Sequence, residues 1–319
     1  KQSTDSFIGT CRKLFIYRAS SGTNYITLGT HQKFYILEGN VFSDVTPIRA
    51  TTTNGIVFAA TNGSTTITAT DDAHGAVEGD FVTISSAVSL GGNITASVLN
   101  QEYQITSVPS VDTFTFTATA TANSSDSGNG GSAADAAYQI NTGLDVYVKS
   151  TGWGSGTWGA STWGSANDLT LTNQLRLWSI DNFGDDVVLN PRAGGIFYWD
   201  ESSGGNTRAV NATSLTNASD VPTKVLQIMI SDVDKHAIAF GCNPIGSTTI
   251  DPLLVRFSDT ESIIDWTPTA TNQAGGVQLS MGSTIIGALR TRQEILIWTD
   301  AGIVSMRFVG APFVFSFNE

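Results

Sequence analysis

Short apolar runs alternate with polar turns along most of this chain. The mainly apolar run at residues 33–37 (KFYIL) is followed by the polar turn of residues 44–47, and the run at 253–257 (LLVRF) is followed in the same way by residues 265–268. A strand, a polar turn and a return strand, used repeatedly, are typical of sheet proteins of radial or solenoid type. No stretch of about eleven residues carries a 3.6-residue apolar stripe with a cap, so we expect an all-β fold.

The strand pattern is densest in the second half of the chain. Short strands without long helices predict several antiparallel sheets, and strands that are apolar nearly throughout are typical of β-propeller blades, whose two faces are both covered. We therefore predict an incomplete or multi-blade β-propeller-like core over residues 1–50 and 141–319, which continues beyond the end of the given chain. The candidate strands after residue 174 are 175–178, 187–189, 195–199, 225–230, 237–240, 253–257, 285–289, 295–298, 303–309 and 314–317.

A composition change after Arg49 indicates an inserted module. Residues 53–122 are rich in Thr, Ala, Ser and Val, and they alternate with period two at 65–70 and 113–117. Such alternation places one face of a strand inward and the other outward. We predict a small β-sandwich or barrel module here. Residues 123–140 begin with a Ser-, Gly- and Asn-rich run, which predicts a flexible linker back to the core.

Composition and charge exclude some classes of function. Hydrophobic residues make up 40% of the chain and charged residues only 14%, with 32 glycines, a balance that favours sheets with tight turns. The net charge of −12 argues against wrapping nucleic acid, although it would not hinder DNA passing through a wide tube. No apolar run approaches the roughly 20 residues of a membrane span. Cys11 and Cys242 are predicted to be free, buried thiols.

Three tryptophans form the most unusual local pattern. Trp153, Trp158 and Trp163 recur every five residues, each followed by Gly, and five matches neither the strand nor the helix period. One interpretation is that the rings pack on neighbouring sheets or subunits. The other is an aromatic platform that stacks on sugars or bases. No basic residue lies between these tryptophans, which disfavours the stacking of bases.

No motif in the chain predicts catalysis, a metal site or a cofactor site. A catalytic site needs a nucleophile, an acid–base pair or a metal cluster within reach of one another. The three histidines are isolated in sequence, and the carboxylate pairs lack the Gly and Glu of an EF-hand loop, so we interpret those pairs as turn residues. The same interpretation applies to the carboxylates that a glycosidase would require. These residues are His31, His74 and His236; Asp71, Asp72, Asp185, Asp186, Asp232 and Asp234; and Asp200, Glu201 and Asp259.

Two segments suggest an internal repeat. Residues 30–37 (THQKFYIL) align with residues 291–298 (TRQEILIW), with Thr, Gln and the apolar run in common. The match supports an internal repeat in a chain rich in β-strands.

Several segments together resemble structural proteins of tailed bacteriophages, of the tubular tail or nozzle kind. The resemblance covers residues 1–50 and 141–319, and the insert at 53–122 resembles a sandwich module common in phage virion proteins. Besides the Trp-Gly run, the segments are 29–35 (GTHQKFY), 44–49 (DVTPIR), 175–186 (LRLWSIDNFGDD), 190–200 (NPRAGGIFYWD), 255–259 (VRFSD) and 265–268 (DWTP).

This resemblance implies a β-propeller-based subunit of the virion tail, several copies of which form a ring, expected to be a hexamer, around a DNA channel. It implies contacts with portal-complex, adaptor and fibre proteins, and DNA passage without sequence-specific contact. It assigns no catalytic residue and no cofactor, so we expect a non-enzymatic protein. Two alternatives stay open: a host-glycan adhesin that uses Trp153, Trp158 and Trp163, and a carbohydrate-active propeller enzyme.

Overall fold

The computed structural model describes residues 6–146, 175–310 and 313–318, and these residues form an all-β fold. The chain divides into two compact units: Lys1–Val45 together with Leu144–Glu319 form unit 1, and Thr46–Gly143 form unit 2. The sole α-helix of the described residues is the one-turn α1 (Ala96–Leu99) in unit 2. No helix in the described ranges has the length and apolar character needed to cross a bilayer.

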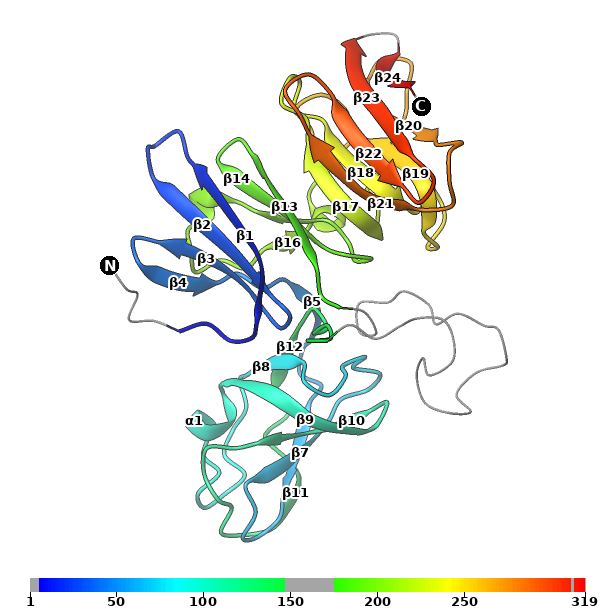
Figure 1. The fold of residues 1–319 in the computed structure, drawn as a ribbon. Helices are drawn as coiled ribbons and strands as arrows, with labels where there is room; N and C mark the ends of the chain where they lie inside the picture. The colour runs from blue at the N-terminus through cyan, green and yellow to red at the C-terminus, as the bar shows by residue number, and fades with distance from the viewer. Residues whose placement is uncertain (1–5, 147–174, 311–312, 319) are drawn as a thin grey trace. The chain divides into compact units, whose positions relative to one another are not determined.

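The described part of unit 1 contains four separate four-stranded sheets (Figure 1). In each sheet the strands follow one another in sequence order, and all pairs are antiparallel. The first sheet consists of β1 (Cys11–Arg18), β2 (Asn24–Thr30), β3 (Phe34–Glu38) and β4 (Val41–Asp44). The second consists of β13 (Trp178–Phe183), β14 (Asp186–Pro191), β15 (Phe197–Trp199) and β16 (Val210–Asn211).

The third and fourth sheets repeat this plan. The third consists of β17 (Val225–Ile230), β18 (Ala237–Cys242), β19 (Asp251–Phe257) and β20 (Gly275–Gln278). The fourth consists of β21 (Ile285–Arg290), β22 (Ile295–Thr299), β23 (Ile303–Gly310) and β24 (Val314–Asn318).

The core of unit 1 lies between successive sheets. One cluster joins Val188 of the second sheet to Ile228 and Trp266 of the third, and another joins Phe240 of the third sheet to Ile297 of the fourth. A sheet between two neighbours is therefore covered on both faces, and every residue of β18 is buried. This explains why β18 is apolar at consecutive positions instead of alternating.

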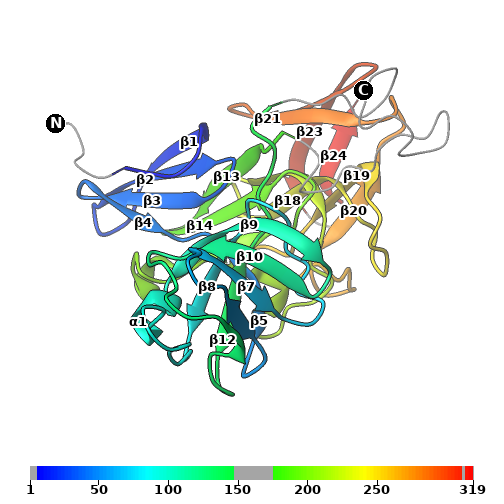
Figure 2. The ribbon, with the colours of Figure 1, turned by 90° about the horizontal axis from the view of Figure 1, so that it is seen from below.

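Unit 2 contains one eight-stranded antiparallel sheet in the order β11-β6-β7-β10-β9-β8-β12-β5 (Figure 2). Residues from both halves of the sheet, such as Phe58, Phe116 and Tyr138, share a single core, so the sheet folds over on itself. The order leaves β11 and β5 as edges. The strands are β5 (Ile48–Thr52), β6 (Val57–Ala60), β7 (Thr66–Thr70), β8 (Phe81–Ser85), β9 (Glu102–Ser110), β10 (Thr113–Thr117), β11 (Asp126–Asn129) and β12 (Asp135–Gln139).

The prediction of a flexible linker over residues 123–140 is wrong. This segment contains β11 and β12, and β12 lies between β5 and β8 in the sheet. Ala134, Ala136 and Tyr138 of this segment belong to the buried core. The module therefore extends from Thr46 to Gly143, beyond the predicted 53–122.

The repeat predicted for residues 30–37 and 291–298 is a repeated turn and not an equivalent place in two sheets. Thr30 precedes the third strand of its sheet, whereas Thr291 precedes the second. In both turns the Thr hydroxyl bonds to the residue three positions later, Lys33 at 3.0 Å and Glu294 at 2.7 Å. Thr299 makes the same turn with Gly302, and this turn does occupy the place of the Thr30 turn.

The two cysteines are both free, but they differ in environment. Cys242 is fully buried in β18, as predicted, whereas Cys11 at the start of β1 is exposed. The prediction of a buried thiol is therefore wrong for Cys11, because β1 is an edge strand with a partner, β2, on one side only.

Candidate functional site

The first strands of the second and third sheets, β13 and β17, are joined through two polar side chains of β13. The backbone N–H of Ile228 donates to Ser179 Oγ at 2.9 Å, and that of Ile230 donates to Asp181 Oδ2 at 2.9 Å. Positions i and i+2 of a strand point to the same side, so Ser179 and Asp181 reach the same neighbour. Each side chain takes the place of a missing strand-to-strand hydrogen bond.

The third and fourth sheets are joined in a related way. Gln227 Nε2 donates to the carbonyl of Ala288 at 2.7 Å, and Gln227 Oε1 accepts from its N–H at 2.8 Å. Arg290 reaches back from β21 to the carbonyl of Ile230 at 2.5 Å and to Asp181 Oδ2 at 3.2 Å. Asp181 is thus held by both of the sheets that follow its own.

The first and second sheets meet through Trp178. Its Nε1 donates to the carbonyl of Thr30 at 2.7 Å, and its ring lies 5.1 Å from the ring of Phe34, centroid to centroid. Gly29 permits this approach, because a Cβ placed there would lie 2.5 Å from Trp178 Cδ1. The close contact makes Gly29 a structural requirement of the junction.

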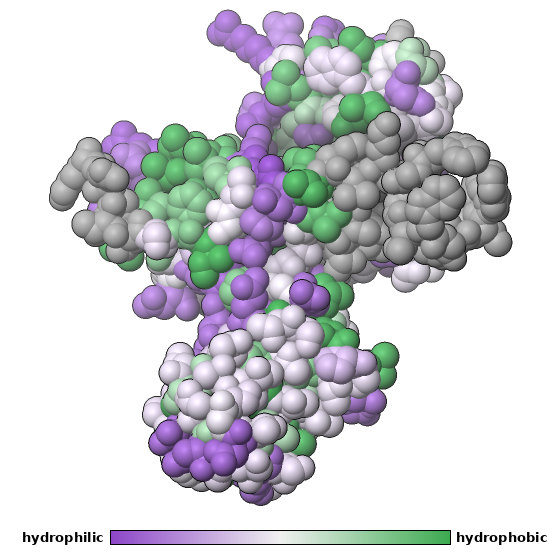
Figure 3. Space-filling model, turned by 60° about the horizontal axis from the view of Figure 1, so that its bottom comes forward, coloured by the Kyte–Doolittle hydropathy of each residue, from purple (hydrophilic) through white to green (hydrophobic). Residues whose placement is uncertain are grey.

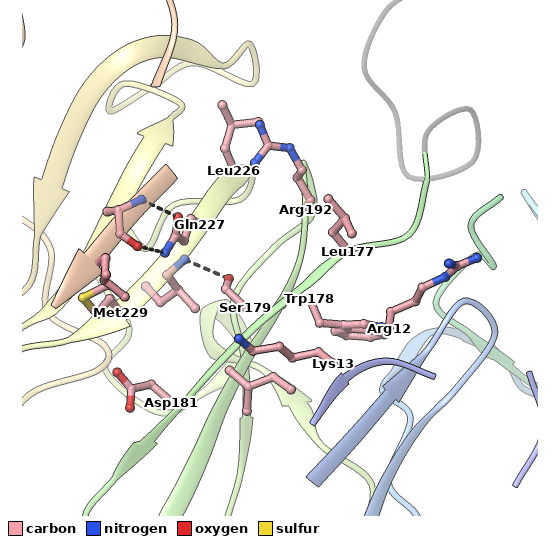
Figure 4. Close-up of a pocket in the computed structure, with 14 residues that line it drawn as sticks. Arg12, Lys13, Leu177, Trp178, Ser179, Asp181, Arg192, Leu226, Gln227 and Met229 are labelled. Carbon is pink, nitrogen blue, oxygen red and sulfur yellow. Dashed lines mark hydrogen bonds between the residues drawn. The ribbon is translucent and has the colours of Figure 1, made fainter. Parts of the chain in front are cut away.

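A cavity of about 390 Å³ lies between these first strands (Figure 4). Its wall comes from β1, β13, β17, β21 and the turn after β14. Leu177, Trp178 and Leu226 supply apolar surface, and the cations Arg12, Lys13 and Arg192 supply charge.

The cavity carries positive charge in an acidic chain. Arg12 forms an ion pair with Asp145 at 2.6 Å, and burial lowers the pKa of the Arg192 guanidinium. Burial raises the pKa of Asp181, while the Ile230 N–H and Arg290 act against that rise. The arrangement can attract anions, but Asp181 and Gln227 are already committed to the sheet junctions.

The polar side chains described in the cavity wall make structural contacts. Ser179 Oγ, the hydroxyl in its wall, bonds to Asn190 Oδ1 at 3.0 Å and accepts from Ile228, so no base activates it. None of the described residues that line the cavity is a His or a Cys. Among the described residues, no group of three His, Cys, Asp or Glu side chains is placed to hold a metal ion.

The carboxylates considered for a glycosidase make structural contacts. Asp200 caps the 3₁₀ turn Glu201–Ser203, and its bonds to Ser202 lower its pKa. Glu201 accepts from Tyr25 Oη at 2.8 Å, and Asp259 accepts from the Gln273 N–H at 2.8 Å. These contacts favour the interpretation of all three as turn residues.

The predicted aromatic platform lies outside the described residues. Trp153, Trp158 and Trp163 fall within residues 147–174, so their role stays a prediction. Sequence reasoning missed Ser179, Asp181 and Gln227. The available signal was a polar residue inside an otherwise apolar strand, as in Leu226-Gln227-Ile228.

The comparisons with known proteins assign no family to the chain. No family model matches the chain, and no curated protein matches it. Among solved structures, an alignment with "Phage phi92 endosialidase" covers 94% of this chain and 42% of that chain, with a TM-score of 0.25 and 13% sequence identity. The chain thus spans less than half the length of that structure, and a likeness at this level carries no argument about fold or function.

Proposed function

We propose that the chain is a structural subunit of a bacteriophage tail, of the tubular tail or nozzle kind, with unit 1 as part of a β-propeller-like core. The resemblance of residues 1–50 and 141–319 to such proteins supports the tail assignment. The sheet plan supports the fold, because β13 packs beside both β1 and β17, and Gln227 joins β17 to β21. Neighbouring first strands of successive four-stranded sheets are typical of propeller blades.

The observation that carries the proposal is the set of bonds between the first strands. Ser179, Asp181 and Gln227 use their polar atoms on the backbone of the next sheet. Polar side chains in a binding or catalytic site instead direct their atoms at a ligand. Polar side chains that bond to the backbone of a neighbouring sheet stiffen the unit, and a tail part under mechanical load requires stiffness.

The assembly we propose is a ring of identical subunits in the virion tail. The ring surrounds a DNA channel, adjoins the adaptor and portal complex on one side, and meets fibre proteins at its periphery. The acidic balance of the chain, −12 overall, limits adhesion of DNA to such a channel. Unit 2, with its own core, lies at the periphery of the ring in this proposal.

We propose that the chain has a structural role and is not an enzyme. Asp200, Glu201 and Asp259 serve the local structure, and Ser179 serves a sheet junction. This favours a building block over a carbohydrate-active enzyme.

Electron microscopy of the purified chain and of isolated tails tests the proposal. We expect a closed ring of about six copies with a central passage, since cyclic symmetry is the usual solution for identical subunits. A monomer that hydrolyses polysaccharide, with activity lost on Asp200→Asn or Asp259→Asn, would overturn it.

The adhesin alternative has its own test. Saturable quenching of tryptophan fluorescence by a host glycan, lost when Trp153, Trp158 and Trp163 are replaced together by Ala, would favour glycan binding. Unchanged fluorescence across a glycan panel would argue against it.

A further inference from the structure

The first sheet of unit 1 has one covered face and one open face. Tyr25 and Ile36 lie on the covered face, at 4% and 1% exposure, and Tyr25 packs against Trp199 of the second sheet. The cross-strand pairs Ile16–Ile26, Ile26–Leu37 and Leu37–Phe42 place these residues together on the opposite face. We call this open surface, made of Leu14, Ile16, Ile26, Leu37 and Phe42, face A.

Face A is strongly apolar and accessible. Leu14 is 55% exposed and Ile16 is 67% exposed. Figure 3 shows hydrophobic residues gathered over the sheet of β1–β4, on the left of the view. Exposed apolar patches of this kind on a stable protein usually mark an interaction site.

The fourth sheet also has one covered and one open face, and its covered face packs on the sheet that precedes it in the chain. Ile297 and Val304, which are fully buried, face the third sheet. The pairs Leu289–Leu296 and Trp298–Ile303 lie on the other side of the sheet. We call this surface, made of Leu289, Leu296, Trp298 and Ile303, face B; Leu289 is 58% exposed and Ile303 is 47% exposed.

Faces A and B match the two sides of the junctions already present in unit 1. At every internal junction, the face of one sheet that points to the next sheet in chain order (its forward face) packs on the face of that next sheet that points back (its backward face). Face B is the forward face of the fourth sheet, and face A is the backward face of the first. A contact between B and A would therefore continue the same series of sheets with the same polarity.

We propose that face B of one copy packs on face A of a second copy. Within the described residues, Leu14, Ile16, Leu289 and Ile303 are exposed, so faces A and B do not cover each other there. A second copy supplies both surfaces in equal number. Such a head-to-tail contact closes into a ring when its rotation permits. The inference rests on the proposed ring assembly and names the surface that builds it.

Complementary variants of the full chain test the contact. Leu14→Asp with Ile16→Asp disables face A, and Leu289→Asp with Ile303→Asp disables face B. Val88→Asp with Val111→Asp is the matched control, because these residues of unit 2 are also exposed, at 54% and 74%. All the replaced side chains are exposed, so each variant is expected to fold, which circular dichroism verifies for both units.

Sedimentation velocity over a concentration series gives the readout. We expect the wild type and the control to self-associate, and each face variant alone to associate at least about tenfold more weakly. An equimolar mixture of the two variants should form dimers and nothing larger, because each variant keeps the face that the other lacks.

Three results would overturn the inference: a wild type that stays monomeric, face variants that assemble like the wild type, or a mixture that forms no dimer. If the face variants still form rings, the subunit contact lies elsewhere and the proposed tail function stands. If the wild type forms no ring and is absent from tails, the proposed function fails as well.

Discussion

Gln227 and Ala288 are bonded as two residues of paired strands would be, although β17 and β21 belong to different sheets. The side-chain amide of Gln227 presents one donor and one acceptor, and it meets the N–H and carbonyl of Ala288 at 2.8 and 2.7 Å. A single side chain thereby replaces a peptide group at the junction of the third and fourth sheets.

Replacing Gln227 by Ala should lower the free energy of unfolding of unit 1 by about 2 kcal/mol, because both polar groups of Ala288 lose their partner. Urea unfolding followed by tryptophan fluorescence measures this, since all seven tryptophans lie in unit 1. Gln278→Ala, at an exposed position, is the control and should change the value by less than about 0.5 kcal/mol. Equal effects of the two substitutions would contradict the bridging role.

Gly29→Ala should destabilise unit 1 by about 2–3 kcal/mol, because the added methyl group would overlap the Trp178 ring and force it to shift. Gly287→Ala is a matched control in β21, where the nearest atom to a new Cβ is Gln227 Oε1 at an ordinary 3.5 Å. The melting temperatures of the two variants give the comparison. A Gly29 variant as stable as the Gly287 variant would show that Trp178 can move without cost.

Arg290→Ala should destabilise unit 1 more at pH 7.5 than at pH 4.5. Burial raises the pKa of Asp181, and Arg290 is one of the groups that oppose the rise, so its removal moves the pKa higher still. A carboxyl whose pKa is raised on folding favours the folded state at low pH, and this contribution is lost as the pH rises through the folded pKa.

We expect a loss of about 2–3 kcal/mol at pH 7.5, below the value for a fully buried pair because 32% of the Arg290 side chain is exposed. Urea titrations at the two pH values measure it, with Arg292→Ala as the exposed control. An equal loss at both pH values would show that the ion pair with Asp181 contributes nothing.

The two thiols should differ sharply in reactivity. Burial raises the pKa of Cys242 to about 12, whereas Cys11 is exposed. At pH 8 a disulfide reagent should label one thiol per native chain within minutes and Cys242 at least about a thousandfold more slowly. Labelling of Cys11→Ser checks the assignment: this variant should react only after denaturation. Rapid labelling of the native variant would place Cys242 within reach of solvent.

Unit 2 should fold alone. All of its strands pair within the unit, and it has its own core, in which Phe58, Phe114 and Phe116 are each exposed by 1% or less. A fragment of residues 46–143 is expected to give dispersed amide NMR signals and one cooperative melting transition. A shorter fragment of residues 53–122, which lacks β5, β11 and β12, should not. Equal behaviour of both fragments would show that the three strands are dispensable.

Strands in the middle of unit 1 were predictable because both faces of an inner sheet are covered. The run Ala237–Cys242 is apolar at consecutive positions, and this pattern can be recognised in the sequence without knowing which sheets lie beside it. The last strands of unit 2 were harder to predict from the sequence. The edge strand Asp126–Asn129 has the composition of a loop, and three of its four residues are exposed.

The junction contacts could not be predicted in the same way. Gln227 and Ala288 are far apart in sequence, as are Trp178 and Thr30, and only the folded sheets bring them together. A polar residue in an apolar strand indicates a buried partner, but it does not say which one. The sequence therefore predicts that such residues matter and leaves their partners open.

The pairing of β5 with β12 has a consequence for how this chain can change over time. These two strands are the first and last of unit 2, and they run antiparallel beside each other, with Ala137 opposite Thr51. The chain therefore enters and leaves unit 2 through two neighbouring strands. A differently folded cassette with similarly spaced ends could be exchanged here by recombination while the interlocked sheets kept their packing.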